Sequence, residues 1–310
     1  MSCIPAHPAW RPLVPTDKTV LDRYARAHAP FAEATLATLL VWNDPGGCRI
    51  TELNGNIVLR HESCGGGAVQ SILGPHRTVQ TSAELLAGRS GVLELIPDYS
   101  VAHVATAEWA AAGLELRPDR DNDDYVFETS SLSTLAGNAL KGKRRRRNAF
   151  ERSHEPELRT LDLTSCSDIG AVLGCAETWF RQVGEGPGPL PLEELAGLTH
   201  LLELTRTGAV AGIEGFGVVV GGELVAFSIV EHHGTDIVSG VVFKARRDLP
   251  GSGEFLRSAS AGALAQSGVR KINAQQDLGQ PGLREMKRAY RPSAMLQKWT
   301  IASREDHVAC

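Results

Sequence analysis

The chain has 310 residues, 42% hydrophobic and 22% charged, with a formal net charge of -4. This is ordinary globular composition with enough apolar residues for a core, and the absence of a run of about 18 apolar residues excludes a membrane-spanning helix. The N-terminal stretch lacks the apolar segment of a secretory signal, so we expect a cytoplasmic protein. The six cysteines are scattered without a C-x-x-C pair, which argues against a zinc site or a disulfide framework.

The N-terminal half has the pattern of a mixed α/β unit. A helix is predicted from Thr16, which is a good N-cap residue. Asn54-Gly55 stands between two β-rich runs and predicts a tight hairpin. Apolar periodicity then predicts a helix from Thr81, a strand over 91–97, a helix over 100–113 and a strand over 123–128.

One helix is predicted from Ser131 to roughly His154, ended by Pro156. Its first half carries apolar residues at helical spacing, and five consecutive basic residues follow, Lys143 to Arg147. Because consecutive helical residues lie about 100° apart, these side chains point all round the axis. No face of this turn can be buried without burying a charge, so we expect it to meet water or an anionic partner.

The C-terminal half follows a more regular order. A helix over 191–208 precedes two strands within 216–230, joined by a turn at Gly221-Gly222. The remaining predicted elements are a strand over 236–243, a glycine-containing loop opening into a helix that ends at Gly268, a strand over 269–276, a helix over 282–290 and a strand over 294–301. This order is similar to the core of the GNAT acyltransferases.

The loop before the helix that ends at Gly268 departs from the GNAT pattern. In that family R/Q-x-x-G-x-G/A holds the pyrophosphate of coenzyme A through backbone N–H groups at a helix N-terminus. The matching residues run from Asp248 to Gly253, with Asp248 in place of Arg or Gln and with Pro250, which has no N–H. Both departures predict weak binding of coenzyme A.

Two spaced motifs carry a closer resemblance. "INAQQDLGQPGLREMKRAYRP", Ile272 to Pro292, resembles the signature "NREEDLGxxGLRxAKxSYxP" of the phosphatidylglycerol lysyltransferase C-terminal domain family, the DUF2156 group. The segment "DNDDYVFETSSLSTLAGNALKGKRRRRNAF" resembles that family's "DYVY…L.LxGkkxxxKRNxxxxF". Together with "WRPLVPTDKTVLDRY" near the N-terminus, the resemblance covers nearly the whole chain.

The resemblance implies a fold and an activity. It implies an α/β (α+β) protein with two tandem GNAT-like domains and mixed, mainly antiparallel sheets. The expected ranges are an N-terminal domain over 1–130, a basic linking helix over 131–156 and a catalytic C-terminal domain over 157–310. Family members take an aminoacyl group from charged tRNA and place it on a lipid headgroup or another acceptor.

The resemblance also nominates site residues. The expected catalytic groups are Asp277, for which a helix N-cap or turn role is the competing interpretation, Tyr290, and one of Glu214 and Glu231, between which the sequence does not choose. The expected substrate-binding residues are Asn273, Gln275, Gln276, Arg284 and Lys287. The family's two acidic residues are replaced here by Gln275 and Gln276, which favours a neutral donor such as Ser, Ala or Gly. No metal site is expected at His232-His233, because adjacent strand residues point to opposite faces.

The basic block allows three interpretations. It is a solvated charge run, a contact to the phosphates of tRNA, or a membrane-surface patch. With the family resemblance we favour tRNA, and the expected tRNA-binding residues are Lys141, Lys143, Arg144, Arg145, Arg146 and Arg147. Because the chain as a whole is not basic, this predicts a local contact and not wide wrapping.

These observations predict a soluble aminoacyltransferase. Its donor is charged tRNA as co-substrate, with no other cofactor, and its acceptor is an amine or hydroxylamine of a small molecule or a peptide. DNA is not an expected partner. The alternatives are an acyl-CoA-dependent N-acetyltransferase and a non-catalytic RNA-binding protein with a decayed GNAT site.

Overall fold

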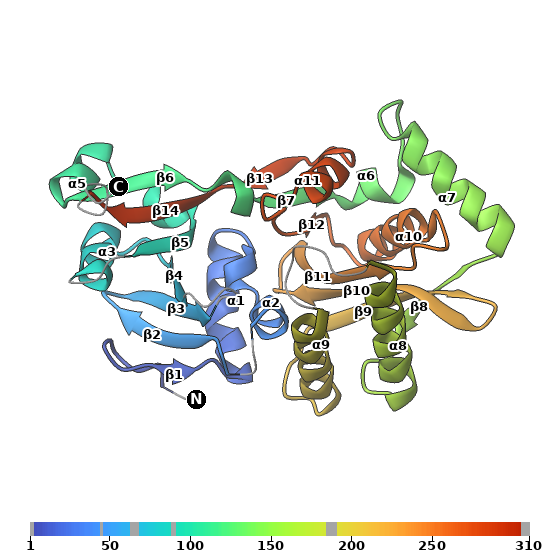
Figure 1. Ribbon diagram of the computed structural model, residues 1–310, viewed down its shortest axis with the longest axis horizontal. Helices are drawn as coiled ribbons and strands as arrows, with labels where there is room; N and C mark the ends of the chain where they lie inside the picture. The colour runs from blue at the N-terminus through green and yellow to red at the C-terminus, as the bar shows by residue number, and fades with distance from the viewer. Residues whose placement is uncertain (1–2, 44–45, 63–67, 88–90, 184–190, 305–310) are drawn as a thin grey trace.

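The computed structural model describes residues 3–43, 46–62, 68–87, 91–183 and 191–304, and Figure 1 shows two sheets side by side. Sheet A, on the left in that view, has the strand order β1-β2-β3-β4-β5-β14-β6. Its strands are β1 (Arg11–Pro12), β2 (Arg49–Leu53), β3 (Asn56–Glu62), β4 (Ala68–Leu73), β5 (Val92–Pro97), β14 (Lys298–Ser303) and β6 (Leu114–Pro118).

Sheet B, on the right, has the order β13-β7-β12-β11-β10-β9-β8. Its strands are β13 (Ala294–Leu296), β7 (Asp124–Glu128), β12 (Lys271–Asn273), β11 (Ile237–Ala245), β10 (Glu223–His232), β9 (Ile213–Val220) and β8 (Glu157–Leu161). Most neighbouring strands in both sheets run antiparallel. The predicted turns at Asn54-Gly55 and Gly221-Gly222 are confirmed, and all four residues have the positive φ that such hairpins require.

Helices cover the sheets and join them. The helices are α1 (Lys18–Ala27), α2 (Leu36–Val41), α3 (Thr78–Leu86), α4 (Asp98–Val101), α5 (Thr106–Ala111), α6 (Thr129–Thr134), α7 (Lys141–His154), α8 (Cys166–Val183), α9 (Pro191–Arg206), α10 (Ser252–Gln266) and α11 (Pro281–Arg288), with single turns η1 (Pro15–Asp17), η2 (Ala32–Ala34) and η3 (Arg120–Asn122). Helices α8 and α9 pack into one apolar cluster with sheet B and α10 into another.

The two units meet where α2 packs on α9. Gly197 of α9 lies so close to α2 that a Cβ atom there would stand 2.1 Å from the carbonyl oxygen of Val41. Any larger residue would push the helices apart. The apolar cluster under sheet A also takes in Val210, from the segment that leads into sheet B. One continuous body therefore holds both sheets.

The two sheets exchange strands, so they do not coincide with the sequence ranges expected for the domains. Strand β7 belongs to the expected N-terminal range but pairs with β12 and β13 in sheet B. The last strand, β14, returns to sheet A and lies between β5 and β6. Each sheet is therefore completed by a strand from the far part of the chain.

Each sheet contains one short parallel pair. In sheet A, β4 and β5 pair only at Gln70 and Leu93. In sheet B, β11 and β12 pair from Ile237 opposite Lys271 to Ser239 opposite Asn273. Beyond these points the described residues of these strands form no further pairs, so the two strands of each pair splay apart. The fold predicted from the sequence, two GNAT-like units with mainly antiparallel sheets, is confirmed.

The single helix predicted from Ser131 to His154 is wrong in its continuity. The chain forms two helices, α6 and α7, and the segment between them begins at Leu135, whose φ is 50°. A left-handed residue ends a helix because the next N–H turns away from the helical ladder. Leu135 and Leu140 are both buried in the apolar cluster around Tyr125. The bend between the two helices places both side chains in this cluster, where the sequence had predicted a single continuous helix with its apolar residues on one face. Both helices pack on α10 and thus belong to the sheet B unit.

Candidate active site

A cavity of about 640 Å³ lies between the two sheets. Val69 and Leu95, from the splayed strands of sheet A, form one part of its wall. The residues from Gly240 to Phe243 on β11 and from Ala274 to Gln276 after β12 form another part. Both splayed pairs therefore open onto the same space, which both sheets help to enclose.

Strand β11 carries a bulge where it borders this cavity. Ile229 of β10 pairs with Val242, but the next residue, Val230, pairs with Gly240, so Val241 has no opposite residue. A β-bulge leaves its extra residue out of the hydrogen-bond ladder. Val241, the extra residue of this bulge, lines the cavity.

Four of the predicted site residues line the cavity: Gln275, Gln276, Lys287 and Tyr290. The amide nitrogen of Gln275 donates to Thr38 Oγ1 and to the carbonyl of Gly240, each at 2.7 Å. That side chain thus links sheet B to α2. The Oε1 atom of Gln276 is buried without a partner in the described part of the chain.

Lys287 holds the segment that carries these two glutamines. Its ammonium donates to the carbonyl oxygens of Ala274, Gln275 and Gln276. Burial lowers the pKa of Lys287 to about 7. Since its hydrogen bonds all go to the backbone of one loop, Lys287 fixes the shape of the cavity wall, where Gln275 has a φ of 60°.

Asp277 does not line the cavity; its hydrogen bonds hold the loop between β12 and α11 in place. Its carboxylate is fully buried and accepts from Tyr125 Oη at 2.6 Å, from Arg284 Nε at 2.9 Å and from the N–H of Gly279. Burial raises the pKa of Asp277, but the Arg284, Tyr125 and Gly279 hydrogen bonds outweigh it and bring the pKa to about 2. A carboxylate this acidic is a poor proton acceptor at neutral pH, so the geometry favours a positioning role for Asp277 and Arg284.

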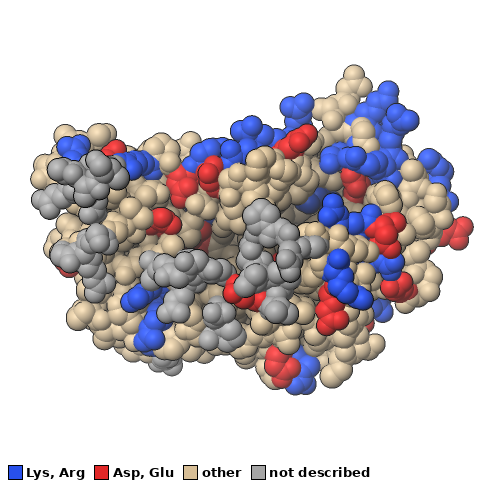
Figure 2. All heavy atoms as spheres, viewed as in Figure 1, with Lys and Arg blue, Asp and Glu red and all other residues tan. Residues whose placement is uncertain are grey.

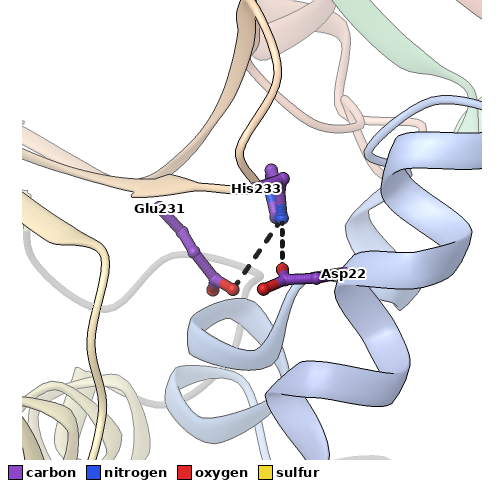
Figure 3. Close-up of side chains that lie close together, drawn as sticks. All are labelled: Asp22, Glu231 and His233. Atoms are coloured by element: carbon purple, nitrogen blue, oxygen red, sulfur yellow. Dashed lines mark hydrogen bonds and ion pairs between the residues drawn. The ribbon is translucent and has the colours of Figure 1, made fainter.

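Glu231 also lies outside the cavity, in a buried ionic cluster (Figure 3). Its Oε2 accepts the N–H of Ala37 at 2.6 Å, and its Oε1 is 2.9 Å from the ammonium of Lys18. Asp22 and His233 complete a group with the spacing of metal ligands. The Lys18 ammonium, however, already bridges the two carboxylates and is 2.8 Å from Asp22 Oδ1. The cluster is an ion-pair network that joins α1 to β10.

The remaining expected residues are likewise engaged elsewhere. Oε2 of Glu214 lies 2.8 Å from Nε2 of His232, and both side chains are partly exposed. Asn273 is fully buried and donates to the carbonyl of Pro30 and to Asp124. The amide of Asn273 thus connects sheet B to the chain segment before η2.

Sequence analysis missed Glu33, Asp124 and Lys298, which form a buried ionic triad beside the cavity. The ammonium of Lys298 is 2.8 Å from Glu33 Oε1 and 2.8 Å from Asp124 Oδ1. Burial and the charge of Asp124 raise the pKa of Glu33 to about 7, although Lys298 acts in the opposite direction. The three residues come from η2, β7 and β14, so no local pattern could have brought them together.

Further polar atoms along the cavity lack partners within the described part of the chain. They are the indole nitrogen of Trp42, the hydroxyl of Ser228 and Nε of Arg257. Buried donors and acceptors are nearly always paired in a folded protein. A set of them around one cavity is typical of a site that binds a polar ligand or ordered water.

The loop that binds pyrophosphate in GNAT enzymes is covered here by α7. A Cβ atom on Gly251 would lie 2.6 Å from the carbonyl oxygen of Arg146 and 2.7 Å from Cβ of Phe150. In the first turn of α10, the carboxylate of Glu254 is 2.8 Å from Arg146 Nε. The N-terminus of α10 thus faces a helix and a carboxylate.

The basic block is partly used by the protein itself. Arg144 donates to backbone carbonyls at the end of α6, including Gly137 at 3.2 Å, and Arg147 donates to Ser258 Oγ at 3.0 Å. The Lys143 ammonium lies 4.5 Å from the ring centroid of Tyr290, and so connects the block to the cavity wall. Arg145 and Lys141 are exposed. Figure 2 shows Lys and Arg side chains gathered over α7 and along the adjoining edge of the molecule.

In the described residues, none of the helices has both the length and the apolar character needed to cross a bilayer.

Solved structures confirm the fold. A conserved protein of unknown function from Bacteroides thetaiotaomicron has a TM-score of 0.76 at 19% identity, over 95% of this chain and 99% of that one. L-PGS from Bacillus licheniformis has a TM-score of 0.62 at 15% identity, over 94% and 93%. A C-terminal DUF2156 domain from Agrobacterium fabrum has a TM-score of 0.61 at 12% identity, over 94% and 95%.

The sequence itself shows the family. Curated proteins give no match to this chain. The family described as phosphatidylglycerol lysyltransferase, C-terminal, matches residues 27–302, which take in sheet B, nearly all of sheet A except β1, and the residues that line the cavity. The resemblance inferred from the two spaced motifs is therefore confirmed, and the chain belongs to the phosphatidylglycerol lysyltransferase C-terminal family of transferases.

Proposed function

We propose that the protein takes an aminoacyl group from charged tRNA and transfers it to an amine or hydroxylamine of a small molecule or peptide. The observation that carries this proposal is the cavity between the two splayed strand pairs, lined by unpartnered polar atoms and bordered by the basic helix α7. The family supports aminoacyl transfer, and the covered pyrophosphate loop argues against coenzyme A as the donor.

The chemistry requires few protein groups, because an amine attacks an ester downhill. The acceptor nitrogen forms a bond to the ester carbonyl carbon, and the developing oxyanion takes hydrogen bonds from N–H groups at the Val241 bulge. The C–O bond to the ribose then breaks. One proton leaves the nitrogen and one proton reaches the ribose oxygen, so the charges balance. The main contribution of the protein is to hold the two reactants together.

Tyr290 is the residue that we assign to this proton transfer. Its ring lies in the cavity wall, and its centroid is 4.5 Å from the ammonium of Lys143 and 4.7 Å from the guanidinium carbon of Arg257. Burial raises the pKa of Tyr290, so its phenol remains protonated at neutral pH. It can donate to the leaving oxygen and be reprotonated from the attacking amine.

The donor amino acid is proposed to be small and neutral. A cationic side chain would need carboxylates, whereas the loop after β12 presents the amides of Gln275 and Gln276. The amide nitrogen of Gln275 is committed to Thr38 and Gly240, whereas Oε1 of Gln276 is buried without a partner among the described residues. Serine, alanine and glycine fit this description.

The test is to offer the purified protein a full set of charged tRNAs with a pool of candidate amines. We expect an RNase-sensitive acylated product, whose mass identifies the amino acid. Product formation from acetyl-CoA without tRNA would instead support the N-acetyltransferase alternative. Binding of tRNA without any product would support a non-catalytic RNA-binding protein.

A further inference from the structure

Glu33 lines the cavity and carries a buried carboxylate oxygen that no described residue satisfies. Among the described residues of the cavity wall, the carboxylates are Glu33 and Glu194. The Glu194 carboxylate is neutralised by Lys244, whose ammonium lies 2.7 Å from its Oε1. Oε2 of Glu33 is buried and has no partner in the described part of the chain. It is the acceptor in this wall with charge still available for a ligand.

The surroundings of Glu33 hold this oxygen in place without neutralising it. The Lys298 ammonium binds Oε1 of Glu33 but also binds Asp124 at the same distance of 2.8 Å. Asp124 has two further donors, the N–H of Ala32 and the amide of Asn273. One ammonium is thus shared by two carboxylates, and the better-bonded of the two is Asp124. A second cation beside Glu33 Oε2 would balance the charge of the triad.

We propose that Glu33 Oε2 binds the α-ammonium group of the aminoacyl donor, which makes Glu33 the residue that distinguishes an aminoacyl ester from a simple acyl ester. This inference rests on the proposed function and names the part of the donor that the cavity recognises. Oε1 of Gln276, also buried in the wall without a partner, is a second acceptor for the same N–H groups.

The charge of Glu33 gives the site its selectivity. A donor without a free α-amine, such as a propionyl or N-acetylated aminoacyl group, would bury Oε2 against an apolar or acyl surface with no donor. A buried charge left without its partner is strongly unfavourable, so such donors are rejected. Glycine, alanine and serine all carry the same α-ammonium, so this contact is independent of the side chain.

The test measures binding without turnover. The probe is 3′-(L-alanylamino)-3′-deoxyadenosine, a non-hydrolysable mimic of the charged tRNA terminus, compared with its propionyl analogue that lacks the α-amine. We expect Glu33→Gln to weaken the alanyl probe about 10–100-fold, the loss typical of one hydrogen bond to a charged group. Binding of the propionyl analogue should change little or improve. Glu52→Gln, the same chemical change at an exposed position of β2, should leave both affinities unchanged.

Glu33→Gln is expected to fold, because Lys298 keeps Asp124 as its partner. Equal weakening of both probes, no weakening of either, or no binding of the alanyl probe to the wild-type protein would overturn the inference. Glu33-dependent binding of the alanyl probe without any transfer from charged tRNA would uphold the site and refute the proposed function. If charged tRNA serves as donor and the Glu33→Gln variant still discriminates equally against donors without an α-amine, the proposed function stands and the assigned role of Glu33 is refuted.

Discussion

Asp277 illustrates how one carboxylate can match a catalytic motif and yet serve to hold the structure. As a catalytic group, which is the role expected from the sequence, Asp277 would lose turnover and little stability on substitution by Asn. The buried contacts with Arg284 and Tyr125 lead us to expect the opposite, a loss of about 2–4 kcal/mol in the free energy of unfolding. Urea denaturation of the two proteins measures this difference. An unchanged midpoint with a large loss of turnover would return Asp277 to the reaction centre.

Tyr290, expected from the sequence to be catalytic and found in the cavity wall, is the residue to which we assign the proton transfer. Tyr290→Phe removes only the phenol oxygen and preserves the ring that Lys143 and Arg257 contact. Turnover should fall by about 10²–10⁴-fold, the usual contribution of a general acid or base. The melting temperature should change little. Single-turnover measurements of aminoacyl transfer check this, and unchanged rates would show that the phenol is dispensable.

Glu33 should leave a signature in the dependence of stability on pH. Burial and Asp124 raise its pKa from the ordinary value of 4.5 to about 7, so between these values the folded protein binds a proton that the unfolded chain does not. Stability attributable to Glu33 is therefore fully present below about pH 4.5 and is lost as the pH rises through about 7, by up to roughly 3 kcal/mol. The charged and titratable groups that face Glu33 are Lys298, Asp124 and Tyr99, with His61 beyond Lys298.

The comparison with Glu33→Gln isolates this effect, since the neighbouring groups are the same in both proteins. The difference in free energy of unfolding between wild type and variant should fall from pH 4.5 to pH 8. Denaturant titrations at several pH values give it directly. Parallel profiles would mean that Glu33 has an ordinary pKa in the folded state.

At the scale of elements, the packing of α7 on α10 should decide which donor is used. Because α7 covers the N-terminus of α10 at Gly251, and the carboxylate of Glu254 stands in its first turn, the pyrophosphate of coenzyme A would meet a packed helix and a negative charge there. Calorimetry with acetyl-CoA should show no micromolar binding. Glu254→Gln removes the charge but leaves α7 in place, so it should not create binding. A micromolar affinity in the wild-type protein would promote the acetyltransferase alternative.

For the whole molecule, we predict that α7 makes a local contact with tRNA. The exposed residues Lys141 and Arg145 are better targets than Arg144 or Arg146, which bind α6 and Glu254. Changing both to Gln should weaken binding of charged tRNA, uniformly across base sequences. It should also make the slope of log affinity against log salt shallower by about one unit for each lost phosphate contact.

Fluorescence anisotropy at several salt concentrations tests this. The charge-matched control is Arg23→Gln with Arg181→Gln, at exposed positions on α1 and α8. The control should bind tRNA like the wild-type protein. Identical affinities and slopes for both double variants would assign the block to a solvated surface, a membrane or an acidic protein.

The sequence by itself determined the features that depend only on residues close together in the chain. The hairpin turns follow from the conformations that Asn54-Gly55 and Gly221-Gly222 favour, and the order of elements in the C-terminal half follows from local apolar periodicity. The two motifs were enough for the family and the GNAT-like fold, because they lie within single stretches of chain. Gln275, Gln276, Lys287 and Tyr290 were found at the cavity for the same reason.

Only the tertiary structure decided which distant residues share a site. The exchange of β7 and β14 between the sheets brings Asp124 and Lys298 to Glu33, across sequence separations that no periodicity reveals. The bend at Leu135 arises because burying Leu135 and Leu140 outweighs continuing one helix. A titratable group takes its role from burial and from the charges that surround it, and both are properties of the folded chain. For that reason we assign Asp277 a positioning role and propose Glu33 as a ligand-binding residue.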